Sequence, residues 1–274
     1  MTVGTLWLVA TPIGNLGDLS PRAVEVLGSA AVVCCEDTRR TGRLLQHAGI
    51  RAERLAVTNA HTEFHRTDEV LELLGAGRDV ALVTDAGTPG VSDPGTHLVA
   101  AAVAAGFAVS AVPGPVAAIT ALTISGLPTD RFVFEGFLPR SGRDRGDRVS
   151  EIAREPRTVV IYEAPHRIER TITDLAAACG DDRPVALCRE LTKLHETVVR
   201  GPIGSIDVGT PRGEYVIVLG GATADSTPVD DERLVAALRS ELAAGASTRD
   251  AVSTVATRFG APRKAVYALA IADR

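Results

Sequence analysis

The stretch from Leu82 to Pro94 most constrains the fold, because it puts a long irregular loop directly after a buried strand. The apolar run 80–83 is bounded by turn-forming residues, which is typical of a buried strand in a parallel sheet. Glycines and prolines then prevent regular structure, and helical spacing resumes only at 98–105. Open α/β sheets bind ligands at the carboxyl ends of their strands, so this loop is predicted to form part of a ligand site.

Four residues of this loop suit contact with a ligand. Asp85 and Asp93 bracket it, while Gly87 and Gly90 let a ligand approach bare backbone. The alternative interpretation is an elaborate turn with no ligand.

Strand and helix patterns alternate through the first 112 residues, which predicts an α/β domain over 1–112 with a mostly parallel sheet. Ser20 followed by Pro21 is a typical helix start. The expected strands are 6–10, 31–35, 54–58, 80–83 and 108–112.

A second domain, mixed α/β, is predicted over 113–224, after a hinge at Pro113-Gly114-Pro115. Helices are expected at 116–125, 148–153 and 168–178. Strands are expected at 132–135, 158–162, 185–188, 197–200 and 215–219.

The last part, 225–274, is predicted to be a small helical unit behind a polar linker at 222–231. Its helices are expected at 232–243, 248–259 and 263–272, with joints at 245–250 and 260–264. Short helices joined at glycines resemble a helix-turn-helix unit, and a helical cap on the second domain is the alternative.

Composition limits the classes of function. The chain has 274 residues, a net charge of −5 and 4% aromatic residues, so an RNA contact must come from local basic clusters and not from stacking platforms. Its four cysteines form no C-x-x-C pair, which indicates buried thiols in a reducing cytoplasm. No apolar run reaches the roughly 18 residues of a membrane span, so no membrane partner is expected.

Several familiar chemistries are excluded by the residues themselves. Neither Lys193 nor Lys264 follows a glycine, which rules out a P-loop. The loop at 11–17 lacks the glycine spacing of a dinucleotide fold. His61 and His65 have no third ligand beside them, and no metal site is predicted.

Nine motifs, in order along the chain, resemble the ribosomal RNA small subunit methyltransferase I family of the tetrapyrrole methylase superfamily. They lie at 8–16, 36–39, 85–89, 92–95, 113–115, 126–128, 134–139, 162–167 and 189–193. Gly90 and Val116 depart from the usual pattern of that family.

The resemblance implies two α/β domains of the tetrapyrrole methylase type with a cofactor cleft between them, usually in a homodimer. It implies S-adenosylmethionine-dependent 2′-O-methylation of a cytidine ribose in the decoding region of 16S rRNA, within the 30S subunit. By position, the residues near the cofactor would be Pro12, Ala86, Gly87, Asp93, Ala117 and Leu191.

Methyl transfer to a ribose hydroxyl is an in-line displacement that needs alignment, exclusion of water and a group to accept the proton. Candidate acceptors at strand ends are Glu36, Asp37, Glu135, Glu163, His166 and Glu190. Glu135 and His166 are the first choices, and the alternative is that both are structural or bind phosphate. Asp85 and Asp93 are expected to shape the loop or hold the cofactor and not to act as the base.

Basic residues for RNA are expected in two groups. A glycine-interrupted loop carries Arg140, Arg143, Arg145 and Arg148, which we hypothesise to be a mobile arm that closes on rRNA. Other basic residues flank the motifs, namely Arg39, Arg40, Arg167, Arg189 and Lys193. The alternative is a charged surface that faces solvent and does not bind RNA.

Two other functions compete with the rRNA methyltransferase. One keeps the fold and methylates a tetrapyrrole or another small molecule, and the other is a non-catalytic RNA-binding protein. The sequence leaves open the identity of the base, naked rRNA versus assembled subunit as acceptor, the role of the last helices and the dimer geometry.

Overall fold

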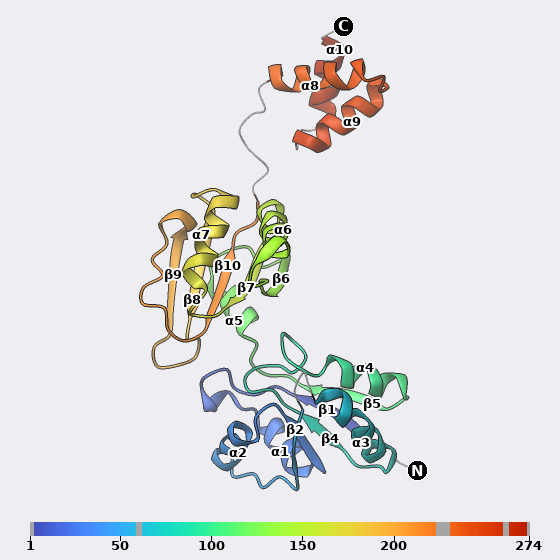
Figure 1. The fold of residues 1–274 in the computed structure, drawn as a ribbon, viewed down its shortest axis with the longest axis vertical. Coiled ribbons are helices and arrows are strands. Elements are labelled where there is room, and N and C mark those ends of the chain that lie inside the picture. Colours follow the sequence, from blue (N-terminus) through green and yellow to red (C-terminus); the bar gives the residue numbers. More distant parts are fainter. Residues whose placement is uncertain (1–2, 59–61, 223–230, 260–262, 273–274) are drawn as a thin grey trace. The chain divides into compact units, whose positions relative to one another are not determined.

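A computed structural model describes residues 3–58, 62–222, 231–259 and 263–272. It divides the chain into two compact units, Met1–Gly220 and Gly221–Arg274 (Figure 1). Most of the linker expected at 222–231 and the centre of the joint expected at 260–264 lie outside the described residues. Within the described residues, no helix is long and apolar enough to span a bilayer.

The first sheet of the larger unit has five parallel strands in the order β3-β2-β4-β1-β5. The strands are β1 (Thr5–Val9), β2 (Val32–Cys35), β3 (Leu55–Val57), β4 (Val80–Leu82) and β5 (Ala108–Val112). β2 and β4 are buried along their whole length, as expected for a sheet covered on both faces.

Helices cover both faces of the first sheet. They are α1 (Pro21–Ser29), α2 (Thr38–His47), α3 (Glu63–Gly75) and α4 (Thr96–Ala104), and a short 3₁₀ turn, η1, spans Leu16–Asp18. Leu27 of α1 and Leu45 of α2 pack with Val33 and Val83 on one face. Leu74 of α3 and Leu98 of α4 belong to the cluster on the other. α1 starts as predicted, since the Ser20 side chain accepts a hydrogen bond from the Ala23 N–H and Pro21 occupies the first turn.

β1 and β4 are neighbours, yet the chain leaves them over opposite faces of the sheet. The helix after β1 packs with one core and the helix after β4 with the other. The loops after these two strands therefore flank a topological switch point, where open α/β sheets form their ligand crevices.

The second sheet is mixed, in the order β6-β7-β10-β8-β9. β6 and β7 are parallel and the other neighbours are antiparallel. The strands are β6 (Phe132–Phe137), β7 (Thr158–Glu163), β8 (Pro184–Arg189), β9 (Thr197–Pro202) and β10 (Tyr215–Leu219).

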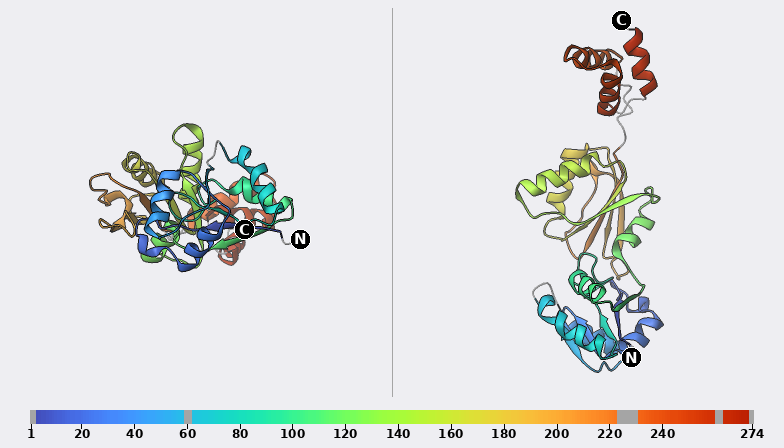
Figure 2. Two further views of the ribbon diagram at one scale, coloured as in Figure 1. Left: turned by 90° about the horizontal axis from the view of Figure 1, so that it is seen from below. Right: turned by 90° about the vertical axis from the view of Figure 1, so that its right-hand side faces the viewer.

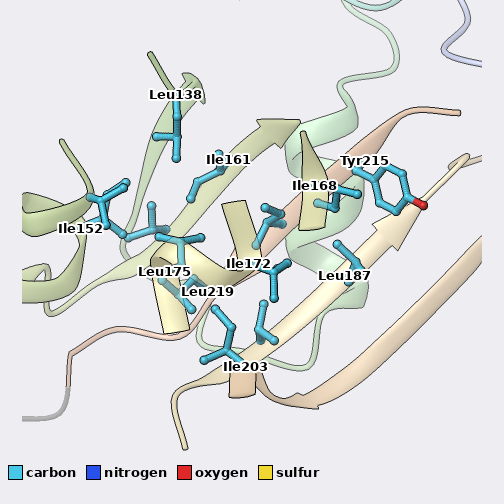
Figure 3. Packing of buried hydrophobic residues seen from close by; sticks show 14 residues of the cluster. Leu138, Ile152, Ile161, Ile168, Ile172, Leu175, Leu187, Ile203, Tyr215 and Leu219 are labelled. Carbon is cyan, nitrogen blue, oxygen red and sulfur yellow. The ribbon is translucent and has the colours of Figure 1, made fainter. Parts of the chain in front are cut away.

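Side-chain alternation along these strands supplies two cores. One face packs on α5 (Ala117–Ile124) through residues such as Val160 and Val218. The other packs on α6 (Gly142–Arg154) and α7 (Ile168–Cys179), which lie on the opposite side of the sheet from α5 (Figure 2). Figure 3 shows side chains of this second core, among them Ile172 and Leu175 of α7. A second 3₁₀ turn, η2, spans Ile203–Ser205.

The segment expected to be a glycine-interrupted basic loop is instead the first half of α6, which begins at Gly142 and not near Arg148. Val149 and Ile152 are buried at helical spacing, and Arg143 pairs with Asp147 one turn later at 3.4 Å. The start of this helix was not predicted because its buried face includes an arginine, Arg145, so the segment lacks a hydrophobic pattern.

The smaller unit contains α8 (Asp231–Ala243), α9 (Thr248–Phe259) and α10 (Arg263–Ala272). Leu238, Val255 and Val266, one from each helix, are buried in its own core. The α/β fold class and the C-terminal helical segment predicted from the sequence are confirmed.

Candidate active site

An apolar hollow beside the switch point, here called the main cavity, has a volume of about 360 Å³. Loops of the first sheet supply one wall, and α5, the end of β7 and the start of β10 supply the other. The size falls within the range of small-molecule sites. Its walls comprise Ile13, Glu36, Arg40, Thr84–Thr88, Val91–Asp93, Val116, Ala117, Phe137, Tyr162–Pro165, Leu191 and Glu214–Val216.

The backbone beside the main cavity is held in unusual conformations. Among the described residues, the non-glycine residues with positive φ are Ser92 (63°), Glu190 (52°) and Thr192 (66°). Ser92 precedes Asp93, and the other two flank Leu191. Such conformations cost about 1–3 kcal/mol each and cluster at sites where a ligand is held, so they indicate that both loops are shaped in advance.

The main cavity brings together most of the residues predicted to bind the cofactor. Ala86, Gly87, Asp93, Ala117 and Leu191 all line it. Pro12 lines an adjoining smaller hollow instead. Of the two departures from the family pattern, Val116 lines the main cavity and Gly90 has a φ of +80°, a conformation that suits glycine.

Besides Glu163, four carboxylates line the main cavity: Glu36, Asp85, Asp93 and Glu214. Burial, together with Glu36, Asp85 and Glu214, raises the pKa of Asp93 to about 6. Burial and the nearby Glu36 also raise the pKa of Asp85, although Arg40 opposes the shift. Clustered carboxylates with raised pKa values in a cleft are typical of functional sites.

Glu163 also lines the main cavity, but its carboxylate is fully engaged. Its Oε2 accepts a 2.6 Å hydrogen bond from the Thr171 hydroxyl, and its Oε1 accepts one from the Ala164 N–H at 2.9 Å. Arg167 pairs with Oε1 at 3.2 Å. This carboxylate therefore fixes the junction between β7 and α7.

Two tyrosines that the sequence did not nominate lie in the wall of the main cavity. The Tyr162 hydroxyl accepts a hydrogen bond from the Ala118 N–H at 3.1 Å, which ties β7 to the start of α5. The Tyr215 hydroxyl is buried and has no hydrogen-bond partner among the described residues. Its ring caps one end of the apolar core (Figure 3). Neither tyrosine was predicted as a site residue, because each lies within a strand pattern that predicts core packing.

The smaller hollow, here called the side hollow, has a volume of about 270 Å³ and adjoins the main cavity. Arg40, Thr84 and Asp85 line both spaces. The loop after β1 and the helix α2 provide the other walls of the side hollow, with Thr11, Pro12, Leu16, Thr41, Arg43 and Leu44.

The two residues predicted first as proton acceptors are not among those that line either hollow. Glu135, on β6, pairs with Arg148 of α6 at 3.3 Å, and 14% of its side chain is exposed. His166 is exposed in the turn before α7. The geometry of the two hollows does not bring these residues to the carboxylate cluster.

The basic residues predicted to bind RNA divide by exposure. Arg39, Arg140 and Arg143 are exposed. Arg189 and Lys193 are half-buried, and Lys193 pairs with Glu190 and Glu214.

Arg145 and Arg167 have structural partners. The Arg145 side chain is only 3% exposed, pairs with Asp174 at 2.8 Å and donates to the Pro139 carbonyl, so the expectation that it contacts RNA is wrong. The Arg167 side chain is 17% exposed, and the guanidinium pairs with Glu163 and donates to the Leu138 carbonyl.

No group of three or more metal-binding side chains with suitable spacing occurs in the part of the chain that the structure describes. His61 lies outside the described residues.

Solved structures define the class of the larger unit. The methyltransferase CobJ matches with a TM-score of 0.62 and 21% identity over 80% of this chain and 95% of that protein. Uroporphyrin-III C-methyltransferase from Thermus thermophilus, complexed with S-adenyl homocysteine, matches with a TM-score of 0.55 and 19% identity over 79% of this chain and 97% of that chain. The fold is that of the tetrapyrrole methylases.

Sequence comparison identifies the family within that class. The family model for tetrapyrrole (corrin/porphyrin) methylases matches residues 5–207, and the model for the RsmI C-terminal HTH domain matches residues 228–274. Ribosomal RNA small subunit methyltransferase I of Synechocystis is 46% identical over 98% of both chains. The Mycobacterium tuberculosis protein of that name is 42% identical over 93% of this chain and 90% of its own. This chain belongs to the ribosomal RNA small subunit methyltransferase I family, and it is a methyltransferase.

Proposed function

We propose that the chain transfers a methyl group from S-adenosylmethionine to the 2′-hydroxyl of a cytidine in the decoding region of 16S rRNA, within the 30S subunit. The observation that carries the proposal is the near full-length similarity to proteins named ribosomal RNA small subunit methyltransferase I. The solved relative complexed with S-adenyl homocysteine, at 19% identity, is consistent with this donor.

The residues of the main cavity fit such a cofactor. Gly87, with φ of +86°, presents bare backbone to it, and the buried Tyr215 hydroxyl is an unmatched polar group in its wall. A buried polar group without a partner is rare, and a ligand hydrogen bond would satisfy it. When bound, S-adenosylmethionine supplies an electrophilic methyl group on a positively charged sulfur.

The chain's own contribution to such a transfer is placement and a dry environment. Ile13, Val116 and Leu191 are apolar residues of the cavity wall, and the Asp93 and Glu36 carboxylates give it negative charge, which would favour a bound sulfonium. Alignment of the two reactants in a water-poor site accounts for several kcal/mol of the barrier in reactions of this kind.

An assay with three acceptors tests the proposal. The protein is incubated with isotopically labelled S-adenosylmethionine and either assembled 30S subunits, naked 16S rRNA or a uroporphyrin-type macrocycle. The expected product is 2′-O-methylcytidine, found by nucleoside mass spectrometry after digestion of the 30S rRNA. Label in the macrocycle would support the small-molecule alternative, and transfer to no acceptor would support an RNA-binding role.

We also propose that the chain forms a homodimer, as the resemblance implies, and that it works in the cytoplasm, as its cysteine pattern indicates. Sedimentation of the full chain at micromolar concentration is expected to give twice the 28.6 kDa chain mass. A monomer at that concentration would contradict it.

A further inference from the structure

Arg40 and Asp85 form an ion pair at the boundary of the main cavity and the side hollow. An Arg40 guanidinium nitrogen lies 3.1 Å from Asp85 Oδ2, and both residues line both spaces. The Arg40 side chain is 67% exposed and that of Asp85 is 26% exposed. The pair therefore lies between the proposed cofactor site and the side hollow, and its Arg40 member has room to move towards solvent.

Two other acidic groups near the pair have hydrogen-bond partners of their own. One oxygen of Glu36, Oε1, accepts hydrogen bonds from the Thr84 hydroxyl and, at 3.1 Å, from the Asp85 N–H. Asp37 caps α2 and pairs with Arg39. Asp85 differs, because its Oδ1 is buried without a hydrogen-bond partner among the described residues. Since Oδ1 is buried, the oxygen that a ligand can reach is Oδ2, the one paired with Arg40.

The walls of the side hollow suit a nucleotide. Pro12, Leu16 and Leu44 offer apolar surface to a base, while Arg40 and Arg43 offer guanidinium groups to phosphate. About 270 Å³ lies just below the usual range for drug-sized ligands of about 300–1,000 Å³, which fits one nucleotide better than a macrocycle of four pyrroles.

We propose that the side hollow receives the acceptor nucleotide, with Arg40 and Arg43 on its phosphates, and that Asp85 accepts the proton of its ribose hydroxyl. The inference rests on the function proposed above and names the acceptor site and the base for it. The hydroxyl O–H bond breaks as an O–CH₃ bond forms and the S–CH₃ bond breaks, leaving its electron pair on sulfur. The proton resides on Asp85 and is then released to water.

Arg40 couples binding of the acceptor to the basicity of Asp85. A phosphate that draws the guanidinium away leaves Oδ2 free and removes a positive neighbour, so the carboxylate becomes a stronger base. The other charged groups that face Asp85 are Glu36 and Asp37 at the end of β2 and Asp93 in its own loop, all acidic. Binding of the acceptor RNA at the side hollow thus makes Asp85 a stronger base.

The test compares single-turnover methylation of 30S subunits between about pH 5 and 9. Wild-type protein is expected to show a rate that rises tenfold per pH unit on an acid limb. Asp85→Asn is expected to lose this limb and about 10²–10⁴-fold in rate, while the dissociation constant of S-adenosylmethionine changes by less than about threefold. Arg40→Ala is expected to raise the KM for the acceptor and to move to higher pH the acid limb of kcat/KM, which reports the free enzyme in which Arg40 pairs with Asp85. Glu53→Gln, in an exposed pair with Arg78, is the carboxylate control and should match wild type.

The outcomes separate this inference from the proposed function. A wild-type protein that methylates no ribose contradicts the function itself. With active wild type, retention of rate and acid limb in Asp85→Asn overturns the inference, as does loss of the limb in Asp93→Asn, Glu135→Gln or His166→Ala instead. A loss of cofactor affinity that accounts for the whole effect of Asp85→Asn also overturns it. Thermal unfolding of each variant confirms that it is folded.

Discussion

Thr11 and Gly87 exchange two backbone hydrogen bonds, 2.9 Å from the Thr11 N–H to the Gly87 carbonyl and 3.1 Å in the reverse direction. This isolated bridge joins the loop after β1 to the loop after β4 at the switch point. The residues of these two loops divide between the main cavity and the side hollow. The bridge therefore holds the proposed cofactor site and the proposed acceptor site in one fixed relation.

Gly87→Ala tests the bridge. The φ of +86° is a left-handed conformation, which costs an alanine about 1–2 kcal/mol, and the new methyl group would lie 3.5 Å from Ile13 in the wall of the main cavity. We expect a loss of about 1 kcal/mol in unfolding free energy and at least about tenfold in S-adenosylmethionine affinity, measured by urea denaturation and calorimetry.

Gly106→Ala provides a matched control, because Gly106 has a φ of +80° and open space around the added carbon. It carries the same backbone cost outside both hollows. Cofactor affinity should stay at the wild-type value in this variant. An equal loss of affinity in both variants would show that the effect of Gly87→Ala comes from general destabilisation.

Asp93→Asn should stabilise the fold near neutral pH and weaken cofactor binding. The folded pKa of about 6 lies above the ordinary value of 3.8, so native Asp93 keeps its proton as pH rises from about 4 to about 6 while the unfolded chain has lost it. The native state loses stability through that window and carries the full cost of the charge above pH 6. With a discount for partial exposure, this cost is about 1 kcal/mol.

Urea denaturation at pH 7.5 is therefore expected to show Asp93→Asn about 1 kcal/mol more stable than wild type, with the gain fading towards pH 4. Calorimetry should show weaker cofactor binding in the same variant. Asp68→Asn, at an exposed position on α3, should change neither quantity. A gain of equal size at pH 4 and pH 7.5 would mean that the Asp93 charge is not its cause.

The sequence predicted the strands and most helices of the larger unit because their signals are local. Short apolar runs bounded by turn formers, such as Val80–Val83, are typical of buried strands, and Ser20 with Pro21 marks a helix start. The beginning of α6 was missed because a hydrophobic pattern does not register a buried arginine: Arg145 occupies an inward position that apolar side chains fill elsewhere on the helix.

The candidate site was predicted only as far as its loops. Motif residues such as Ala86 and Leu191 line the main cavity, yet the choice of Glu135 and His166 placed the proton acceptor away from both hollows. Strand ends give the edge of a sheet at which a residue lies, but which carboxylate keeps an oxygen without a partner depends on tertiary contacts. The Asp85 side chain shows this: its Oδ1 is buried without a partner among the described residues, while the neighbouring Thr84 hydroxyl and Asp85 N–H both donate to Glu36.

Tyr215→Phe and Tyr162→Phe should differ in their effect on the unfolding free energy. Removing the unpartnered Tyr215 hydroxyl is expected to leave the unfolding free energy unchanged or slightly higher and to weaken cofactor binding about five- to tenfold, the value of one hydrogen bond. Removing the Tyr162 hydroxyl leaves the Ala118 N–H without its hydrogen-bond acceptor and is expected to cost about 1–3 kcal/mol of stability. Unchanged cofactor affinity in Tyr215→Phe would show that its hydroxyl does not contact the cofactor.

Arg143 and Arg145 lie two residues apart on α6 and should respond differently to alanine. The Arg143 side chain is 91% exposed, so Arg143→Ala should leave stability unchanged and, if this face binds rRNA, reduce the slope of log affinity against log salt by about 0.7–0.9. Arg145→Ala removes a buried guanidinium from Asp174, Thr171 and the Pro139 carbonyl and should cost about 2–4 kcal/mol of stability.

Filter binding to 30S subunits at several salt concentrations, together with urea denaturation, separates the two effects. Arg39→Ala and Arg140→Ala, at the other exposed positions predicted to bind RNA, extend the series. Lys193 is a weaker candidate, because Glu190 and Glu214 already hold its ammonium group at 2.7 and 2.8 Å, and a phosphate would have to displace them. An unchanged salt slope in Arg143→Ala with a reduced slope in Arg39→Ala would assign the RNA surface to α2, beside the side hollow, and not to α6.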